Sequence, residues 1–241
     1  MTRLTSAMKT DFRIQVRNRL YIIGPVVAVF MGLVISQLAG ANDLVRAVPV
    51  VVLLVIGGTG LLYVGGLVIF EKDEGTLNAV TVSPLRTSEY LLSKVLTLSV
   101  LALFEGVILN GVAVFIISRS QPLAPVNVPL LLAGILVVNL VNTLVGVAII
   151  ARFDSLTDAL VPLIAVGTFL QFPFLYFLEL WPSPLLLAVP TGAPAMLMQG
   201  AFRPLEAWEW AYGIGYSLVA LAALGYWAYH AFRNQLTMKM E

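Results

Sequence analysis

The chain has 241 residues, of which 59% are hydrophobic and only 11% are charged, and its mean hydropathy is +0.94. A soluble domain averages about 25% charged residues, so the composition predicts an integral membrane protein. The net charge of +1 gives no reason to expect a nucleic-acid partner, and the absence of cysteine excludes disulfides, thiolate metal sites and a cysteine nucleophile.

Residues 1–19 carry apolar and basic side chains at intervals of four. The apolar series is Leu4, Met8, Phe12, Val16 and Leu20, and the basic series is Lys9, Arg13 and Arg17. This pattern predicts an amphipathic elbow helix on the inner membrane surface, with its apolar side toward lipid and its cations at lipid phosphates.

A helical span needs about 20 apolar residues, and six segments meet that requirement. They are residues 20–38, 47–70, 95–118, 129–151, 159–178 and 210–231. The predicted fold is therefore all-α, with six transmembrane helices in a single domain over residues 1–241, because no hydrophilic segment is long enough to fold alone.

Residues 180–202 are uncharged but contain Pro182, Pro184, Pro190 and Pro194. Broken backbone is tolerated at membrane depth only where protein or water shields it. The segment is therefore predicted to form two short re-entrant helices in the outer leaflet. With six spans, only Arg46, Arg119 and Arg203 of the 14 Lys and Arg lie outside, so the positive-inside rule predicts cytoplasmic termini.

The longest polar interruption, residues 71–94, is predicted to sit in water between the second and third spans. Its charged cluster leads to Gly75 and a short helix that Thr76 can cap and Pro84 stops. A second helix begins at Thr87 and runs through Lys94 into the third span. The short helix is thus predicted to lie across the membrane surface, joined to a span, where it can transmit the movement of a soluble partner into the bilayer. A plain connecting loop can have the same composition.

Glu105 is the only carboxylate well inside a predicted span, where a charge costs roughly 2.5 to 3.5 kcal/mol. It is either a proton or cation site or a packing glutamate hydrogen-bonded to a neighbouring span. Asn139 and Asn142 share one face of the fourth span, and Asn110 of the third can meet them. These amides either hold helices together or line a translocation path.

Gln171 and Phe172 of the fifth span are candidates for a substrate pocket, with lipid contact as the alternative for the aromatic residue. The glycine run at residues 57–60 fails the spacing of phosphate-binding loops and indicates close helix packing. No G-x-x-x-x-G-K-[ST] motif occurs, so the chain is not expected to hydrolyse ATP itself. An intramembrane enzyme is disfavoured because no G-x-S-x-G occurs and the single histidine, His230, lies far from Glu105.

Taken together, the chain resembles the ABC-2 type permeases, the membrane subunits of ATP-driven exporters. The resemblance rests on the elbow helix, the six spans, the loop E-K-x-E-G-T-L followed by S-P, and the proline-rich pair before the last span. Many members have an acidic residue after G-T-L, whereas this chain has Asn78. Within the family, the segments FEKDEGTL, SPLRTSEYLLSK and WPSPLLLAVPTGAP are most similar to actinobacterial permeases that export fluoroquinolones and other drugs and give antibiotic resistance.

The resemblance implies a pathway for a small hydrophobic or amphipathic compound, enclosed by two permease chains that form a homodimer or a related heterodimer in the bacterial inner membrane. It implies that a separate nucleotide-binding ATPase subunit holds ATP and Mg, with no cofactor on this chain, and docks under the loop. The residues implied in coupling are Glu71, Glu74, Gly75, Thr76, Leu77, Asn78 and Pro84. The rival hypothesis is a proton- or sodium-driven carrier that uses Glu105.

Overall fold

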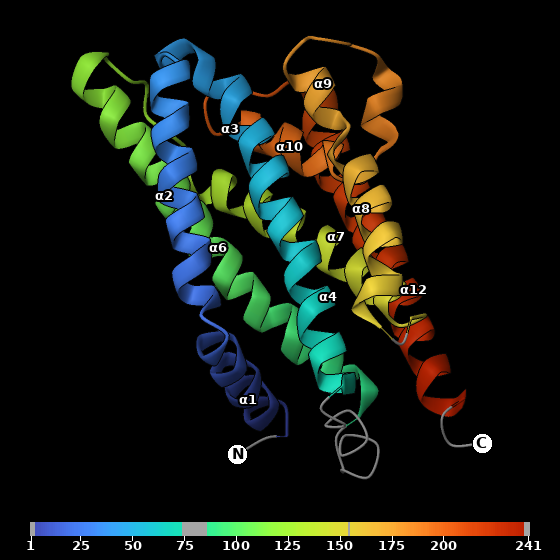
Figure 1. The fold of residues 1–241 in the computed structure, drawn as a ribbon. Helices are drawn as coiled ribbons and strands as arrows, with labels where there is room; N and C mark the ends of the chain where they lie inside the picture. The colour runs from blue at the N-terminus through green and yellow to red at the C-terminus, as the bar shows by residue number, and fades with distance from the viewer. Residues whose placement is uncertain (1–2, 74–85, 154, 239–241) are drawn as a thin grey trace.

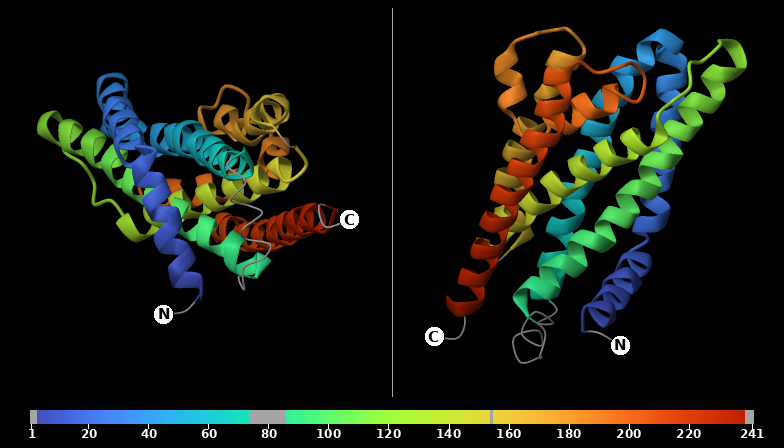
Figure 2. Two further views of the ribbon diagram at one scale, coloured as in Figure 1. Left: turned by 60° about the horizontal axis from the view of Figure 1, so that its bottom comes forward. Right: turned by 180° about the vertical axis from the view of Figure 1, so that it is seen from behind.

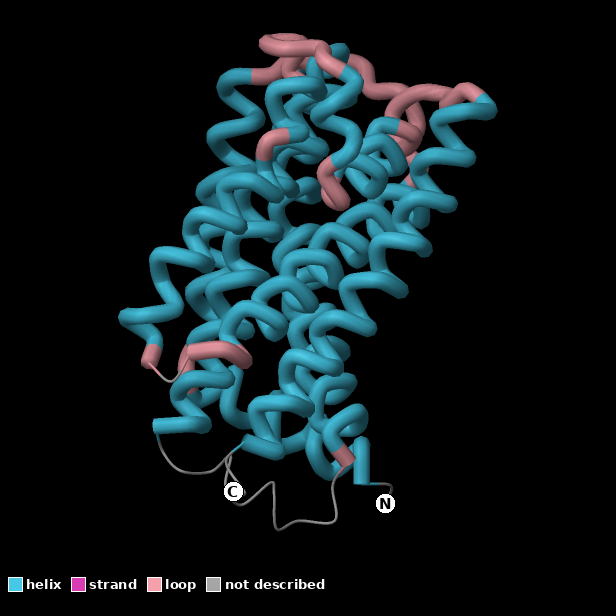
Figure 3. The backbone as a smooth tube through the Cα atoms, turned by 90° about the vertical axis from the view of Figure 1, so that its right-hand side faces the viewer, coloured by secondary structure: helices cyan, strands magenta, loops and turns pink. Residues whose placement is uncertain are grey.

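The structure is a computed structural model that describes residues 3–73, 86–153 and 155–238. Every regular element in these ranges is helical, which confirms the predicted all-α fold (Figure 3). Within the described residues, six helical stretches are long and apolar enough to cross a membrane. They are Leu20–Leu38, Ala41–Glu71, Thr87–Ser120, Val128–Ile150, Thr157–Phe177 and Ala207–Arg233.

The first described helix, α1 (Arg3–Arg17), precedes the first span, α2 (Leu20–Leu38). The second span consists of α3 (Leu44–Val52), a π-helical turn at Leu53–Gly57 and α4 (Gly58–Asp73). The next two spans are α6 (Thr87–Ser120) and α7 (Val128–Ile150). The fifth is α8 (Leu156–Gln171) with the short α9 (Pro173–Phe177), where Pro173 interrupts the helix. The sixth joins α11 (Ala207–Trp210), a π-helical turn at Ala211–Tyr216 and α12 (Ser217–Met238).

Both ends of the chain lie at the same end of the bundle, next to the last turn of α4 and the first turn of α6 (Figure 1). An even number of crossings requires this arrangement. We call this the terminal end, and the opposite end, which holds α9 and the start of α3, the distal end. The charge distribution predicts that the terminal end is cytoplasmic.

The helix α6 is 34 residues long and begins at Thr87, where the sequence predicted a helix to start. At 1.5 Å per residue it is about 51 Å long, and even at a tilt of 40° it rises by about 39 Å. The hydrocarbon core is only about 30 Å thick. Part of α6 therefore extends beyond the apolar layer.

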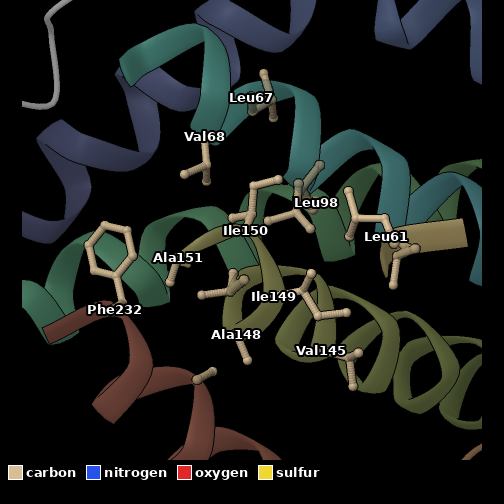
Figure 4. Packing of buried hydrophobic residues seen from close by; sticks show 14 of the residues in the cluster. Leu61, Leu67, Val68, Leu98, Val145, Ala148, Ile149, Ile150, Ala151 and Phe232 are labelled. Carbon is tan, nitrogen blue, oxygen red and sulfur yellow. The ribbon is translucent and has the colours of Figure 1, made fainter. Parts of the chain in front are cut away.

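The fourth span, α7, crosses the bundle diagonally between α12 and α6 (Figure 2). Its side chains Val145, Ile149 and Ile150 pack with Leu61 of α4 and Leu98 of α6 in one apolar cluster (Figure 4). Because α7 contacts α4, α6, α10 and α12, most of its side chains are buried, and it forms the core of the fold.

Residues 180–202 contain two short helices, as the prolines predicted: a 3₁₀ helix at Pro184–Ala188 and α10 (Gly192–Gln199). All eight residues of α10 are buried. Hydrogen bonds to other elements fasten this segment: the Thr191 hydroxyl donates to the Leu170 carbonyl of α8, the Tyr212 hydroxyl donates to the Leu187 carbonyl over 2.6 Å, and the Tyr216 hydroxyl donates to the Ala188 carbonyl. Neighbouring helices thus shield the broken backbone, and its re-entrant placement in the outer leaflet stays a prediction.

Candidate functional site

Three charged side chains meet inside the terminal end of the bundle. Lys94 of α6 is 1% exposed, and its Nζ lies 2.8 Å from Oδ1 of Asp11 on α1 and 2.6 Å from Oε1 of Glu71 on α4. A buried ammonium requires such partners, because water no longer solvates it. We call Asp11, Glu71 and Lys94 the charge cluster.

Two hydroxyl groups of α6 complete the hydrogen bonding of this cluster. Ser93 donates to Oδ2 of Asp11, and the Tyr90 hydroxyl donates to Oε2 of Glu71 over 2.5 Å. The Tyr90 ring also lies 4.8 Å from Nζ of Lys94, within the range of a cation–π contact. Lys94 is shared between two carboxylates, so the Ser93 and Tyr90 hydroxyls give each carboxylate a second hydrogen-bond donor.

The charge cluster corrects one prediction. The sequence analysis placed the whole of residues 71–94 in water because of their charges, but Glu71 lies within the last turns of α4 and Lys94 is buried. Their charges are compatible with burial because they neutralise each other. The other predicted coupling residues, namely Glu74, Gly75, Thr76, Leu77, Asn78 and Pro84, lie outside the described residues.

Sequence reasoning missed Asp11 and Lys94 as partners, although one signal was available. Asp11 is the only acidic residue before Asp43, in a helix whose other charges are basic. Asp11 and Gln15 form the face of α1 that packs on α6, where the Gln15 amide donates to the Thr97 hydroxyl over 2.9 Å. The apolar side chain of Phe12 is 45% exposed on another face, so the contact with lipid predicted for the elbow remains available to it.

Glu105 lies in the middle of α6 and is 1% exposed. Its Oε2 accepts a hydrogen bond from the Thr59 hydroxyl of α4 over 3.3 Å. A Cβ on Gly24 of α2 would lie 1.7 Å from Oε1, so α2 can approach the carboxylate only because residue 24 is glycine. Oε1 has no hydrogen-bond partner among the described residues.

The glycine run at residues 57–60 receives polar side chains from the helices around it. A Cβ on Gly57 would lie 3.1 Å from Nδ2 of Asn142, and one on Gly60 would lie 2.8 Å from Oδ1 of Asn139. The Asn139 amide also donates to the Ser99 hydroxyl of α6 over 3.2 Å. The run is thus a seam of close helix packing, and both asparagines are buried between helices of this chain.

The remaining candidates do not join this seam in the same way. The Asn110 amide donates to the Gly106 carbonyl of its own helix, about 16 Å along α6 from Ser99. Gln171 borders the seam, because a Cβ on Gly58 would lie 3.4 Å from its Nε2. Phe172 is 39% exposed. The structure therefore brings Asn139 and Asn142 together with Gln171 around the glycine run, without Asn110 or Phe172, and whether any of them lines a pathway stays a prediction.

Comparison with known proteins agrees with this architecture. The model of the fluoroquinolones export permease protein family matches residues 2–240. Two fluoroquinolones export permease proteins of Mycobacterium tuberculosis, from strains CDC 1551 / Oshkosh and ATCC 25618 / H37Rv, are each 34% identical over 230 residues, which cover 93% of this chain and 92% of each relative. The six-helix membrane protein described above belongs to the fluoroquinolones export permease protein family.

Proposed function

We propose that this chain is the membrane subunit of an ATP-driven exporter of small amphipathic drugs, fluoroquinolones among them. The family match over residues 2–240 supports export of a drug, and the relatives' names suggest the compound class. ATP and Mg would bind to a separate ATPase subunit, because the chain carries no phosphate-binding loop motif. The location is the bacterial inner membrane, with both termini in the cytoplasm.

The observation that carries the coupling step is the charge cluster. Glu71 lies in the last turn of α4 on one side of residues 74–85, and Lys94 lies two turns into α6 on the other. Lys94 contacts Glu71 over 2.6 Å and Asp11 of α1 over 2.8 Å, so it joins the three helices. A force applied to the loop by the ATPase would therefore move α1, α4 and α6 together.

A second permease chain, identical or related, would complete the pathway. Apolar side chains of the first and fifth spans point away from the bundle, such as Phe30, which is 63% exposed, and Val161, which is 74% exposed. Lipid and the second chain would cover these faces.

The test is a reconstituted transport assay. The tagged chain is purified from its native host in mild detergent together with any ATPase subunit that accompanies it, and is placed in lipid vesicles. We expect a stoichiometric ATP-binding subunit, hydrolysis stimulated by a fluoroquinolone, and ATP-dependent transport of that compound. A chain that carries no ATPase through several detergents, and transports in response to an ion gradient, would refute the ATP-driven exporter.

Loop variants then test coupling itself. Glu74→Lys and Gly75→Pro are expected to abolish transport while hydrolysis continues, because the subunits no longer pass their movement to the spans. Lys9→Glu, which reverses an exposed charge of α1 at the same end, is the matched control and keeps transport. Wild-type transport by both loop variants would show that coupling does not depend on this segment.

One observation favours the rival ion-coupled carrier. Oε1 of Glu105 is buried without a hydrogen-bond partner among the described residues, which is the situation of a carboxylate that can take up a proton or a cation. The family match does not require such a step, so we retain it only as an alternative with its own test, given below.

A further inference from the structure

A cavity opens at the distal end of the bundle, between the start of α3, the end of α9 and the end of α10. These three helices are labelled in Figure 1. Its volume is about 350 Å³, which falls in the range of about 300–1,000 Å³ that is typical of small-molecule sites. The side chains that matter here are Arg46, Tyr176, Phe177, Glu179, Gln199 and Arg203. Two of the three basic residues that the sequence places outside the membrane thus line one cavity.

The wall of the cavity carries both positive and negative side chains, and one ion pair in it can separate. Nη2 of Arg46 lies 2.8 Å from Oε1 of Glu179, but the two side chains are 50% and 59% exposed. An ion pair between side chains as exposed as these contributes only about 0–1 kcal/mol. A ligand can therefore separate Arg46 from Glu179 at little cost and take the place of each partner.

Arg203, by contrast, is held in place. Its Nη1 and Nη2 donate to the two carboxylate oxygens of Glu209 over 2.9 and 2.5 Å, and Nη2 also donates to Oε1 of Gln199 over 3.0 Å. Glu209 is 5% exposed, behind the cavity wall. The hydrogen bonds that Arg203 donates to Glu209 raise the pKa of Arg203, so the guanidinium stays charged. The cavity thus has one fixed cation and one movable pair.

The backbone at Glu179 supports a role for its carboxylate. The residue has φ 57°, in the left-handed region, two positions after the end of α9. Leu180 and Trp181 both donate their N–H groups to the Leu175 carbonyl there, at 3.0 and 3.1 Å, which closes the helix end. Glycine is the usual residue at such a position, and another residue costs about 1–2 kcal/mol. A glutamate here is therefore not explained by the turn.

The positive charges of Arg46 and Arg203 are matched in number by the negative charges of Glu179 and Glu209. The cavity therefore suits a molecule that itself carries both a positive and a negative charge. We propose that it binds a small zwitterion on the export path, whose carboxylate contacts Arg46 beside the fixed positive charge of Arg203, whose ammonium contacts Glu179 and whose ring lies against Tyr176. The inference rests on the proposed function, and it adds where the exported compound is held at the distal end and which of its groups are recognised. A fluoroquinolone with a carboxylate and a basic amine has this chemistry.

Binding is measured with two fluorescent probes on the purified chain in lipid nanodiscs at pH 7. One is a fluoroquinolone that carries both charges, and the other is its methyl ester, in which the carboxylate is masked. We expect Arg46→Gln and Glu179→Gln each to weaken binding of the zwitterion by about tenfold, the change for one lost charged contact of about 1.4 kcal/mol. The ester should bind wild type and Arg46→Gln equally weakly.

Arg119→Gln is the matched control, because Arg119 is exposed at the same end but lies on α6, stacked on Phe115 at 4.7 Å. Melting temperatures verify that each variant is folded. Unchanged affinity in Arg46→Gln and Glu179→Gln, or equal binding of the ester and the zwitterion to wild type, would overturn the site while leaving drug export intact. If wild type neither binds nor transports the zwitterion, both the site and the proposed substrate fall.

Discussion

Replacing Lys94 by methionine tests the charge cluster most directly. The substitution keeps the length of the side chain but removes the ammonium between Asp11 and Glu71, whose side chains are only 9% and 12% exposed. Removing one partner of a buried ion pair costs about 3–5 kcal/mol, because the remaining charge stays buried. Lys94→Met leaves two such carboxylates, so we expect a loss at the upper end of that range.

Asp11→Asn should be much milder. It leaves Lys94 paired with Glu71 and removes the repulsion between the two carboxylates, so the loss is that of one charge-assisted hydrogen bond, about 1.5–3 kcal/mol. In the double variant Asp11→Asn/Lys94→Met, one of the two side chains that lose the ammonium is already neutral. The combined loss should therefore be smaller than the sum of the two single losses.

Both losses are measured by unfolding the chain from mild detergent with increasing sodium dodecyl sulfate, followed by tryptophan fluorescence and circular dichroism. Lys9→Met is the matched control, since Lys9 is an exposed lysine of α1 at the same end. A stabilising role for the charge cluster would be refuted if Lys94→Met unfolded at the same detergent concentration as Lys9→Met, or if the double variant lost the full sum of the single losses.

Four further substitutions test the packing and the polar groups in the middle of the bundle. Gly134→Ala places Cβ 2.3 Å from Cγ of Met198 and should cost about 1–3 kcal/mol in the same unfolding assay, whereas Gly111→Ala meets no atom within 4 Å and should be neutral or stabilising. Glu105→Gln preserves the shape of the side chain and should leave ATP-driven transport near wild type; complete loss of transport would favour the ion-coupled carrier. Asn139→Ala removes one hydrogen bond between helices and should cost only about 0.6 kcal/mol without affecting drug export, so a variant that is stable but inactive would place Asn139 on the pathway.

The spans could be predicted from sequence because each is a long apolar run, and a helix satisfies all of its backbone hydrogen bonds within such a run. The predicted first span, residues 20–38, coincides with α2. The break of residues 180–202 into two short helices also followed from local chemistry, since proline restricts the backbone wherever it occurs. Pattern alone could not show that α10 packs beneath α3 and α7, because that contact depends on the whole bundle.

The charge cluster could not be predicted for a different reason. Hydropathy treats each charged residue as an independent cost, so it assigned Lys94 to water. The cost falls when Asp11, 83 residues earlier in the chain, is brought to 2.8 Å, and a single sequence does not reveal that pairing. The seam of close packing at residues 57–60 shows the same limit. The small residues at 57, 58 and 60 could be identified in the sequence, but the sequence did not show that asparagine and glutamine side chains of other helices pack against them.

The sequence separation within the charge cluster also bears on how the protein is made. Asp11 is synthesised first, Glu71 follows with the second span, and Lys94 arrives only with the third. Until α6 is in place, neither carboxylate can contact Lys94, and the polar face of α1 lacks its hydrogen bonds with Ser93 and Thr97. Closing the cluster therefore marks the completion of the N-terminal half of the protein, and a chain stalled before residue 94 could not join α1 to α4 through Lys94.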